Sequence, residues 1–225
     1  MKYYSIESAC FSGKSTTIQN LAKKGISTML EPLTQVELPD DVNLTSFPEP
    51  TRDGYARRIE GLLFAEKLRT EKIDRLRGVT GLLVGDRSPL AMIVFEDMAL
   101  RYGIGPRDAR EFAREYAITQ LDAAVRAGSI VMPHGIVVLS LDDEAAFSER
   151  LKERGPTQIE ALNQYEPSQF INDTSMRYAS TILGHSAARL SITGADTPDA
   201  VADRLLGVVG CIPICMDPQP IEVLL

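Results

Sequence analysis

The nine residues from Ser8 to Thr16 constrain the fold of this chain more than any other segment; they read Ser-Ala-Cys-Phe-Ser-Gly-Lys-Ser-Thr. They follow a short apolar run at 3–6 that predicts a strand. They open a segment at 16–24 whose apolar residues recur at helical spacing. A turn that ends in Gly-Lys-Ser between a strand and a helix is the context in which such a turn binds phosphate. Backbone N–H groups at the helix start point at one spot and favour negative charge there. We therefore predict a phosphate-binding loop.

Three positions of this loop have distinct consequences. Lys14 supplies a mobile cation for the outer phosphates of a nucleotide, and the Ser15 hydroxyl is placed to ligate magnesium. Loops of this kind usually have glycine where Ser8 stands, because glycine is favoured where the backbone turns sharply or approaches a ligand. A serine fits there if its φ stays negative. A chance Gly-Lys-Ser at a helix start is the alternative, which the flanking strand and helix disfavour.

Composition narrows the class of protein. With 225 residues, 44% of them hydrophobic, the chain can bury a full core and is most simply a single domain, 1–225. A net charge of −7 argues against a nucleic acid polymer as partner, because such binders carry a basic face. Three cysteines make a sparse set, unlike a disulfide framework. The N-terminus carries no signal-peptide pattern and no apolar run approaches the ~20 residues that span a bilayer, so we expect a cytoplasmic protein without a membrane partner.

Short apolar runs alternate with stretches of helical periodicity, which is typical of parallel strands joined by crossover helices. The expected fold is α/β, a five-stranded parallel sheet with helices on both faces. Strands are expected at 3–7, 26–31, 81–86, 135–141 and 188–193. A helix is expected over 107–127, and another after Thr197, an N-cap residue that Pro198 follows at the first helical position.

Two stretches, 36–55 and 155–170, interrupt this regularity after the second and the fourth expected strands. In an open parallel sheet, ligands sit beyond the carboxyl ends of the strands, where such loops gather. Taken alone, each stretch is equally well explained as a surface connection.

Polar side chains stand at two of the expected strand ends. Glu31, at the end of the second strand, could accept a proton from a substrate hydroxyl; an acidic surface residue before a turn is the simpler interpretation. Asp86 and Arg87 follow the third strand, where an aspartate can hold magnesium and an arginine can grip phosphate. A structural ion pair is the alternative for these two residues.

A pair of arginines, Arg150 and Arg154, falls on the helix expected after the fourth strand. Their spacing of four puts both guanidinium groups on one helix face, where they could bind an anion together. The Gly-Pro hinge that follows would let the segment close. Glutamates flank the pair in sequence, and a solvated, salt-bridged face explains it equally well.

Other candidate residues carry less information. Phe64 lies among aliphatic residues of an expected helix, where an aromatic ring usually belongs to the core but could stack on a base. Nothing identifies Cys10 as a nucleophile, because no histidine lies near it in sequence. The two histidines do not pair with cysteines at metal-ligand spacing, so we expect no structural metal.

Taken together, these residues resemble the P-loop nucleoside and nucleotide kinases, especially thymidylate kinases and deoxynucleoside kinases. The resemblance covers almost the whole chain, and the order and spacing of its parts are more specific than any one part. It rests on the phosphate loop, Glu31-Pro32, Leu62-Leu63-Phe64-Ala65, Asp86-Arg87-Ser88, Arg150 with Arg154, Glu160, Tyr178 and Thr193-Gly194-Ala195-Asp196.

The resemblance implies ATP as the phosphate donor, Mg²⁺ as the metal ion and a small-molecule nucleotide or nucleoside as the acceptor. It also implies a lid at about 150–170 that closes over ATP. The residues implied to bind ATP are Ser12, Gly13, Lys14, Ser15, Thr16 and Ala195, and those implied at the metal are Ser15 and Asp86. The acceptor would be bound by Phe64, Arg69 and Arg87. The implied catalytic set is Lys14, Glu31, Asp86, Arg87, Arg150 and Arg154.

The two subfamilies imply different acceptors. The Leu-Leu-Phe-Ala run is similar to thymidylate kinases, yet these usually have Arg where Leu30 stands, an acidic residue in place of Cys10 and Tyr in place of Ser88. Asp-Arg-Ser is more similar to deoxynucleoside kinases, in which the glutamate equivalent to Glu31 is the general base. The chain has no tryptophan, however, and so lacks the aromatic residue expected soon after Glu-Pro.

We therefore expect ATP- and magnesium-dependent phosphoryl transfer to a nucleoside monophosphate, with a dTMP-like acceptor preferred and a nucleoside as the alternative. A kinase of another small molecule is a second alternative. A regulatory protein that binds nucleotide without catalysis is a third, which Ser8 and Cys10 favour. The resemblance also allows a homodimer through the long helices expected at 55–77 and 107–127. The tail at 211–225 could dock on the core, pair with a second subunit or remain loose.

Overall fold

The computed structural model describes residues 1–30 and 49–225. Glu31 and most of the irregular stretch expected at 36–55 lie outside the described residues, so the prediction that Glu31 acts as a base stays a prediction. The end of that stretch is described. There, the Thr51 side chain accepts a hydrogen bond from the backbone N–H of Gly54 over 3.1 Å and caps a helix that begins at Arg52.

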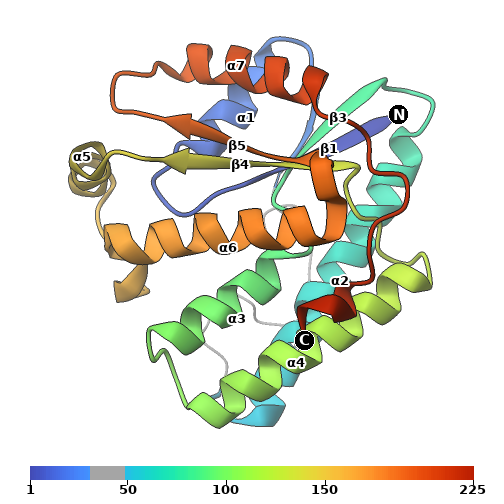
Figure 1. The fold of residues 1–225 in the computed structure, drawn as a ribbon, viewed down its shortest axis with the longest axis vertical. Coiled ribbons are helices and arrows are strands. Elements are labelled where there is room, and N and C mark those ends of the chain that lie inside the picture. Colours follow the sequence, from blue (N-terminus) through green and yellow to red (C-terminus); the bar gives the residue numbers. More distant parts are fainter. Residues whose placement is uncertain (31–48) are drawn as a thin grey trace.

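Five parallel strands form one sheet in the order β2-β3-β1-β4-β5 (Figure 1). Their bounds are β1 Lys2–Glu7, β2 Ser27–Met29, β3 Leu82–Asp86, β4 Gly135–Leu141 and β5 Ala187–Ile192. Each lies within two residues of its expected position, and the expected five-stranded parallel α/β fold is confirmed. Because β1 pairs with β3 on one side and β4 on the other, the loop after β1 leaves from the centre of the sheet. Crevices at this position bind ligands in open α/β sheets.

The helices follow the signals that the sequence carries. Their bounds are α1 Lys14–Lys23, α2 Arg52–Leu76, α3 Ala91–Arg101, α4 Arg107–Arg126, α5 Glu144–Arg154, α6 Tyr165–Leu183 and α7 Pro198–Cys211. The Thr197 side chain caps α7 by accepting from the N–H of Ala200, and Pro198 occupies the first helical position, as expected. Helix α4 matches the expected helix at 107–127 to within one residue.

Helices cover both faces of the sheet. Helices α1 and α7 lie on one face, and α6 lies on the other, where α2, α3 and α4 extend the molecule away from the sheet (Figure 1). Side chains alternate along a strand, so Tyr4 and Ile6 of β1 pack toward α1 and α7, whereas Glu7 faces α3. The carboxyl end of β1 therefore presents an acidic side chain to the helical layer that contains α3.

The segment expected to form a lid, 150–170, contains the end of α5, a turn, the short 3-10 helix η2 (Glu160–Asn163) and the start of α6. Two hydrogen bonds close the turn. Asn163 Oδ1 accepts from the N–H of Thr157 over 2.6 Å, and Asn163 Nδ2 donates to the Thr157 carbonyl oxygen over 3.1 Å. The residues between them are therefore held as one local unit.

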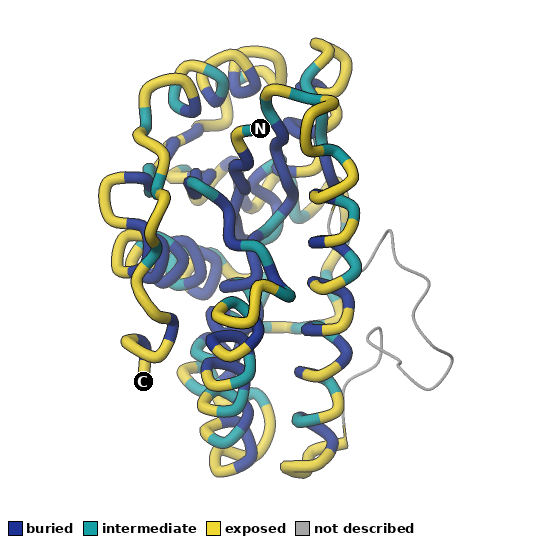
Figure 2. Tube along the Cα trace, turned by 90° about the vertical axis from the view of Figure 1, so that its right-hand side faces the viewer, coloured by how far each residue is buried: buried dark blue, intermediate teal, exposed yellow. Residues whose placement is uncertain are grey.

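The C-terminal tail docks on the core. Its 3-10 helix η4 (Ile221–Leu224) lies against α4, and Ile221 and Leu224 are buried while Val223 is exposed (Figures 1 and 2). The carboxylate of Asp122, on α4, accepts the backbone N–H of Ile221 over 2.6 Å. Among the described residues, no helix has both the length and the apolarity needed to cross a bilayer.

Candidate functional site

The phosphate loop turns at two residues. Gly13 has φ 83°, in the left-handed region that glycine adopts without steric penalty, and it precedes the first turn of α1. Phe11 has φ 64° and is one of two non-glycine residues with positive φ in the described part of the chain. Ser8 is not in that region, so the loop makes its sharp turns at Phe11 and Gly13 and tolerates a serine where related loops have glycine.

Side chains from two helices hold this loop. The Arg150 guanidinium, on α5, donates to the carbonyl oxygen of Phe11 over 3.0 Å, and the Phe11 ring packs edge-on against Phe147 with 5.3 Å between centroids. From α6, the Oδ1 of Asn172 accepts the backbone N–H of Ala9 over 2.9 Å. Left-handed backbone at a non-glycine residue persists only where surrounding contacts stabilise it, and these contacts do so.

An open cavity of about 380 Å³ lies over the loop. Of the residues expected to contact ATP phosphates, Ser12, Gly13, Lys14 and Ser15 line it; Thr16 does not. The remaining lining residues are Ala9, Cys10, Phe11, Arg87, Arg154, Gly155, Pro156 and Thr157. The structure thus brings the loop, the residue after β3 and the end of α5 around one space into which the N-terminus of α1 points.

The ends of β1 and β3 are tied together beside this cavity. Lys14 Nζ donates to the carboxylate of Asp86, and both side chains are almost fully buried. The Arg87 N–H donates to the Ile6 carbonyl oxygen over 2.9 Å, and Arg87 is the second non-glycine residue with positive φ, at 61°. The chain therefore turns at Arg87, directly after the end of β3.

Glu7, the last residue of β1, was missed by the sequence analysis. Its carboxylate accepts the backbone N–H of Ser88, and it lies close to Arg87. Burial raises the pKa of Glu7, although the positive charge of Arg87 and the hydrogen bond from Ser88 oppose the change. The available signal was an acidic residue closing an otherwise apolar strand directly before the loop.

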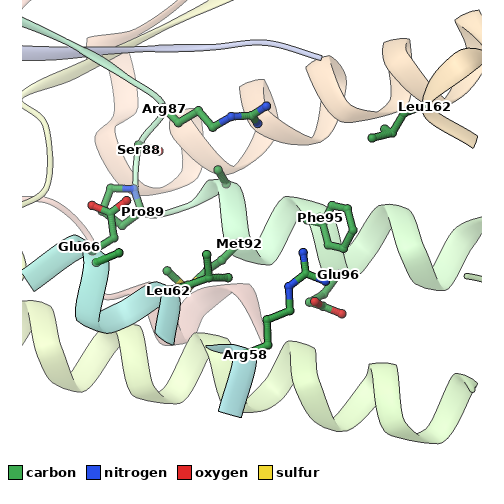
Figure 3. Close-up of a pocket in the computed structure, with 12 residues that line it drawn as sticks. Arg58, Leu62, Glu66, Arg87, Ser88, Pro89, Met92, Phe95, Glu96 and Leu162 are labelled. Atoms are coloured by element: carbon green, nitrogen blue, oxygen red, sulfur yellow. The ribbon is translucent and has the colours of Figure 1, made fainter. Parts of the chain in front are cut away.

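A second pocket, of about 210 Å³, lies between α2 and α3 (Figure 3). Its middle is apolar, with Leu62 from α2, Met92 and Phe95 from α3, and Leu162 from η2. Polar groups stand at its edges, and these are Arg58, Glu66, Arg87, Ser88 and Glu96. A concave apolar site with a few convergent polar groups is the usual form of a small-molecule site.

Arg87 lines both spaces. It lines the cavity over the phosphate loop, called the phosphate cavity below, and it also lines the second pocket. A small cavity between these two spaces is lined by Arg87, Glu7 and Ser8. The segment 150–170, which the sequence analysis expected to form a lid, also reaches both, because Thr157 lines the cavity over the loop and Leu162 the second pocket. The two spaces therefore meet at Arg87 under one connecting segment.

Other expected site residues lie elsewhere. Phe64 is 40% exposed on α2 and does not line the second pocket. Arg69 is buried against the sheet, 3.5 Å from the Glu66 carboxylate and with its guanidinium 5.7 Å from the centroid of the Tyr3 ring. Ala195 is exposed in the turn after β5. Their expected contacts with acceptor and ATP stay predictions.

The residues at the phosphate cavity suit magnesium bound together with a nucleotide. Ser15 is exposed and lines the cavity, and the Asp86 carboxylate pairs with Lys14, which also lines it. Within the described residues, no cluster of three or more histidine, cysteine or acidic side chains is placed to hold a metal ion. Magnesium commonly binds through one or two protein oxygens plus substrate phosphates, so this donor set fits it.

Comparison with known proteins places the fold. No protein-family model matches the chain, and no curated protein matches its sequence. Among solved structures, thymidylate kinase from Candida albicans aligns over 93% of this chain and 91% of its own, at TM-score 0.62 and 13% identity. Deoxyadenosine kinase from M. mycoides, solved with dCMP and dCDP and also with dATP, aligns over 93% and 100%, at TM-score 0.56 and 14% identity. The chain thus has the fold of the P-loop nucleoside and nucleotide kinases, which confirms the resemblance at the level of fold.

Proposed function

We propose that the protein transfers the terminal phosphoryl group of ATP, with magnesium, to a nucleoside or a nucleoside monophosphate. The observation that carries this proposal is the position of Arg87, which lines both the phosphate cavity and the pocket between α2 and α3. A group that passes from one space to the other moves past this guanidinium. The likeness of the fold to a thymidylate kinase and a deoxyadenosine kinase supports the same class of acceptor.

The chain supplies positioning and charge for this reaction. Lys14 and the N–H groups at the start of α1 hold the donor phosphates, and Arg87 binds the transferred group while negative charge develops on it. Bound through Ser15 and Asp86, magnesium would supply charge neutralisation at the phosphates. The segment 150–170 contributes to the walls of both spaces, and its closure over bound substrates would limit the access of water to the transferred group.

The acceptor would lie between α2 and α3 with its reacting group toward Arg87. The preference for a dTMP-like acceptor rested on the run Leu62-Leu63-Phe64-Ala65, of which Leu62 and Ala65 line this pocket and Phe64, the expected stacking residue, does not. Charge favours an uncharged hydroxyl over a phosphate dianion, because the carboxylates of Glu66 and Glu7 lie at this end beside Arg87 and offset its positive charge. Residues 31–48, which follow β2, contain no lysine or arginine. A nucleoside is therefore the favoured acceptor, and Glu31 stays the candidate general base.

Coupled detection of ADP across a panel of nucleosides and their monophosphates tests the proposal. Wild type is expected to release ADP only with an acceptor present, faster with nucleosides than with monophosphates. Lys14→Ala is expected to lower kcat by about 100-fold or more, since one electrostatic contact to a developing charge is worth that much. Lys23→Ala, exposed on the same helix, is the matched control. Absence of transfer by wild type to every member of the panel contradicts the proposal.

A further inference from the structure

The Arg58 guanidinium stands at the wall of the pocket and makes no hydrogen bond to residues 1–30 or 49–225. Arg58 projects from α2 and is partly buried, and Figure 3 shows it across the pocket from Arg87. Within the described part of the chain, its recorded side-chain contact is with the face of Phe95, 4.9 Å from guanidinium carbon to ring centroid. Burial lowers the pKa of Arg58, which reflects the cost of removing this cation from water. A partly buried guanidinium at a pocket wall can donate to a ligand in that pocket, and hydrogen bonds from a charged donor are stronger than neutral ones, so a ligand that accepts hydrogen bonds suits this site.

The neighbouring acid does not satisfy Arg58. The carboxylate of Glu96 accepts a hydrogen bond from Arg110 Nη1 over 2.7 Å, and both side chains are almost fully buried. Arg110 is held further by its Nε, which donates to the carbonyl oxygen of Ile104 over 2.8 Å. Two arginines face one glutamate here, which leaves one positive charge in excess. This end of the pocket therefore offers hydrogen-bond donors and favours ligand atoms that accept hydrogen bonds.

We propose that Arg58 determines base specificity, selecting acceptors whose base carries a carbonyl oxygen beside an unprotonated ring nitrogen. Guanine presents such a pair at O6 and N7, and cytosine at O2 and N3. The inference rests on the proposed function. The planar guanidinium donates two parallel N–H groups, which match two adjacent acceptors. On the base edges away from the sugar, adenine has an amino group next to its ring nitrogens, and thymine has N3–H between its two carbonyl oxygens. Either base would therefore place a hydrogen-bond donor against the donors of Arg58.

The surrounding residues prepare Arg58 for this role. The Phe95 ring restricts the guanidinium through a cation–π contact, so less conformational freedom is lost when a ligand binds. Leu62 and Met92 supply apolar surface between Arg58 and Arg87, which suits the flat faces of a base (Figure 3). A nucleoside held this way directs its base edge to Arg58 and its sugar hydroxyl to Arg87.

The test measures kcat/KM for nucleosides of guanine, cytosine, adenine and thymine with wild type, Arg58→Gln and Arg58→Lys. Wild type is expected to prefer guanine and cytosine. Arg58→Gln is expected to lose about 10-fold or more with these two bases and little with adenine and thymine. Arg58→Lys keeps the positive charge beside Glu96 but lacks the two parallel N–H donors of the guanidinium, so it is expected to behave like Arg58→Gln. Arg57→Gln is the matched control, because its side chain is 69% exposed and pairs with Glu49 on the surface.

Two kinetic outcomes overturn the inference. One is a wild type that prefers adenine or thymine. The other is an equal loss with all four bases in Arg58→Gln that Arg58→Lys restores, because Arg58 then only balances the charge of Glu96. If wild type phosphorylates neither nucleosides nor their monophosphates, the proposed function fails, and calorimetric binding of guanosine and adenosine still tests Arg58. A guanosine preference lost in Arg58→Gln supports the inference, and equal binding of both nucleosides by both proteins contradicts it.

Discussion

Arg150 donates a hydrogen bond of 3.0 Å to the carbonyl oxygen of Phe11, the residue at which the phosphate loop takes left-handed backbone. Phe147, three residues earlier on α5, packs against the Phe11 ring. One helix thus supports both the backbone and the side chain of the strained residue. Arg150 was expected to close over ATP, and the structure shows a second task for it, which is to hold the loop itself.

Arg150→Ala is expected to raise the KM for ATP by about 10-fold, since a hydrogen bond from a charged donor contributes about 1.5–3 kcal/mol. Without the guanidinium, Phe11 can relax from the left-handed region and the loop loses its preformed shape. Steady-state kinetics with ATP varied at saturating acceptor measure the effect. Lys152→Ala, exposed on the same helix, is the control, and an unchanged KM in Arg150→Ala speaks against the role in the loop.

Asn172→Ala is expected to destabilise the fold by about 1–3 kcal/mol, because the buried N–H of Ala9 loses its acceptor. Asn172 also donates to the Ser140 hydroxyl over 3.2 Å, so the substitution disturbs α6 and β4 as well as the loop. Urea unfolding measures the free energy of unfolding of each variant. Asp173→Ala removes only an exposed contact with Arg189 and is expected to change it by less than about 1 kcal/mol. Equal effects of the two substitutions contradict the prediction.

Glu7→Gln is expected to stabilise the folded protein at neutral pH. Burial raises the pKa of Glu7, so the folded protein holds this proton more tightly than the unfolded chain does. The stability linked to the proton is present below the ordinary carboxyl pKa and is lost as pH rises through the raised value. Glutamine removes the charge and still offers an oxygen to the Ser88 N–H.

Urea unfolding of wild type and Glu7→Gln between pH 4 and pH 8 measures this difference. The advantage of the variant is expected to grow as pH rises and to disappear at the acidic end. A variant that is less stable than wild type at pH 8 shows that the attraction between the carboxylate and Arg87 outweighs the cost of burial.

Ile221→Ala is expected to cost about 2–4 kcal/mol of unfolding free energy, because Ile221 is 1% exposed where η4 packs against the core. Val223→Ala, at a residue 54% exposed on the same turn, is expected to change it by about 0.5 kcal/mol or less. Thermal or urea unfolding compares the two variants. A small effect of Ile221→Ala means that the tail contributes little to the stability of the fold.

Local patterns predicted the parts of the site that the chain builds from neighbouring residues. Gly13 and Lys14 follow a strand and open a helix, and the structure has this arrangement because the strand, turn and helix signals are adjacent in sequence. Thr197 and Pro198 mark a helix start by the same local logic. The carboxyl end of β3 was also predictable, and Asp86 at this end forms an ion pair with Lys14, while its expected role at the metal stays a prediction.

The pocket between α2 and α3 was not predictable in this way. Phe64 and Phe95 are both aromatic residues on helices, and the sequence around each does not predict which of the two lines the pocket. That depends on how α2 and α3 rotate as each packs against α4, which brings Phe95 into the wall and leaves Phe64 40% exposed. Arg58 and Glu96 become neighbours for the same reason, although they are far apart along the chain.

By itself, the sequence determined the strand, turn and helix around Gly13 and Lys14, the parallel sheet and the positions of most strand ends, because short-range periodicity and backbone preferences encode them. Only the tertiary structure decided that Phe11 carries the left-handed turn, that Arg150 holds it, and that Arg58 faces the same pocket as Arg87. These relationships join elements distant in the chain. They depend on which helix faces pack together through their apolar side chains, and this is decided by contacts between residues far apart in the sequence.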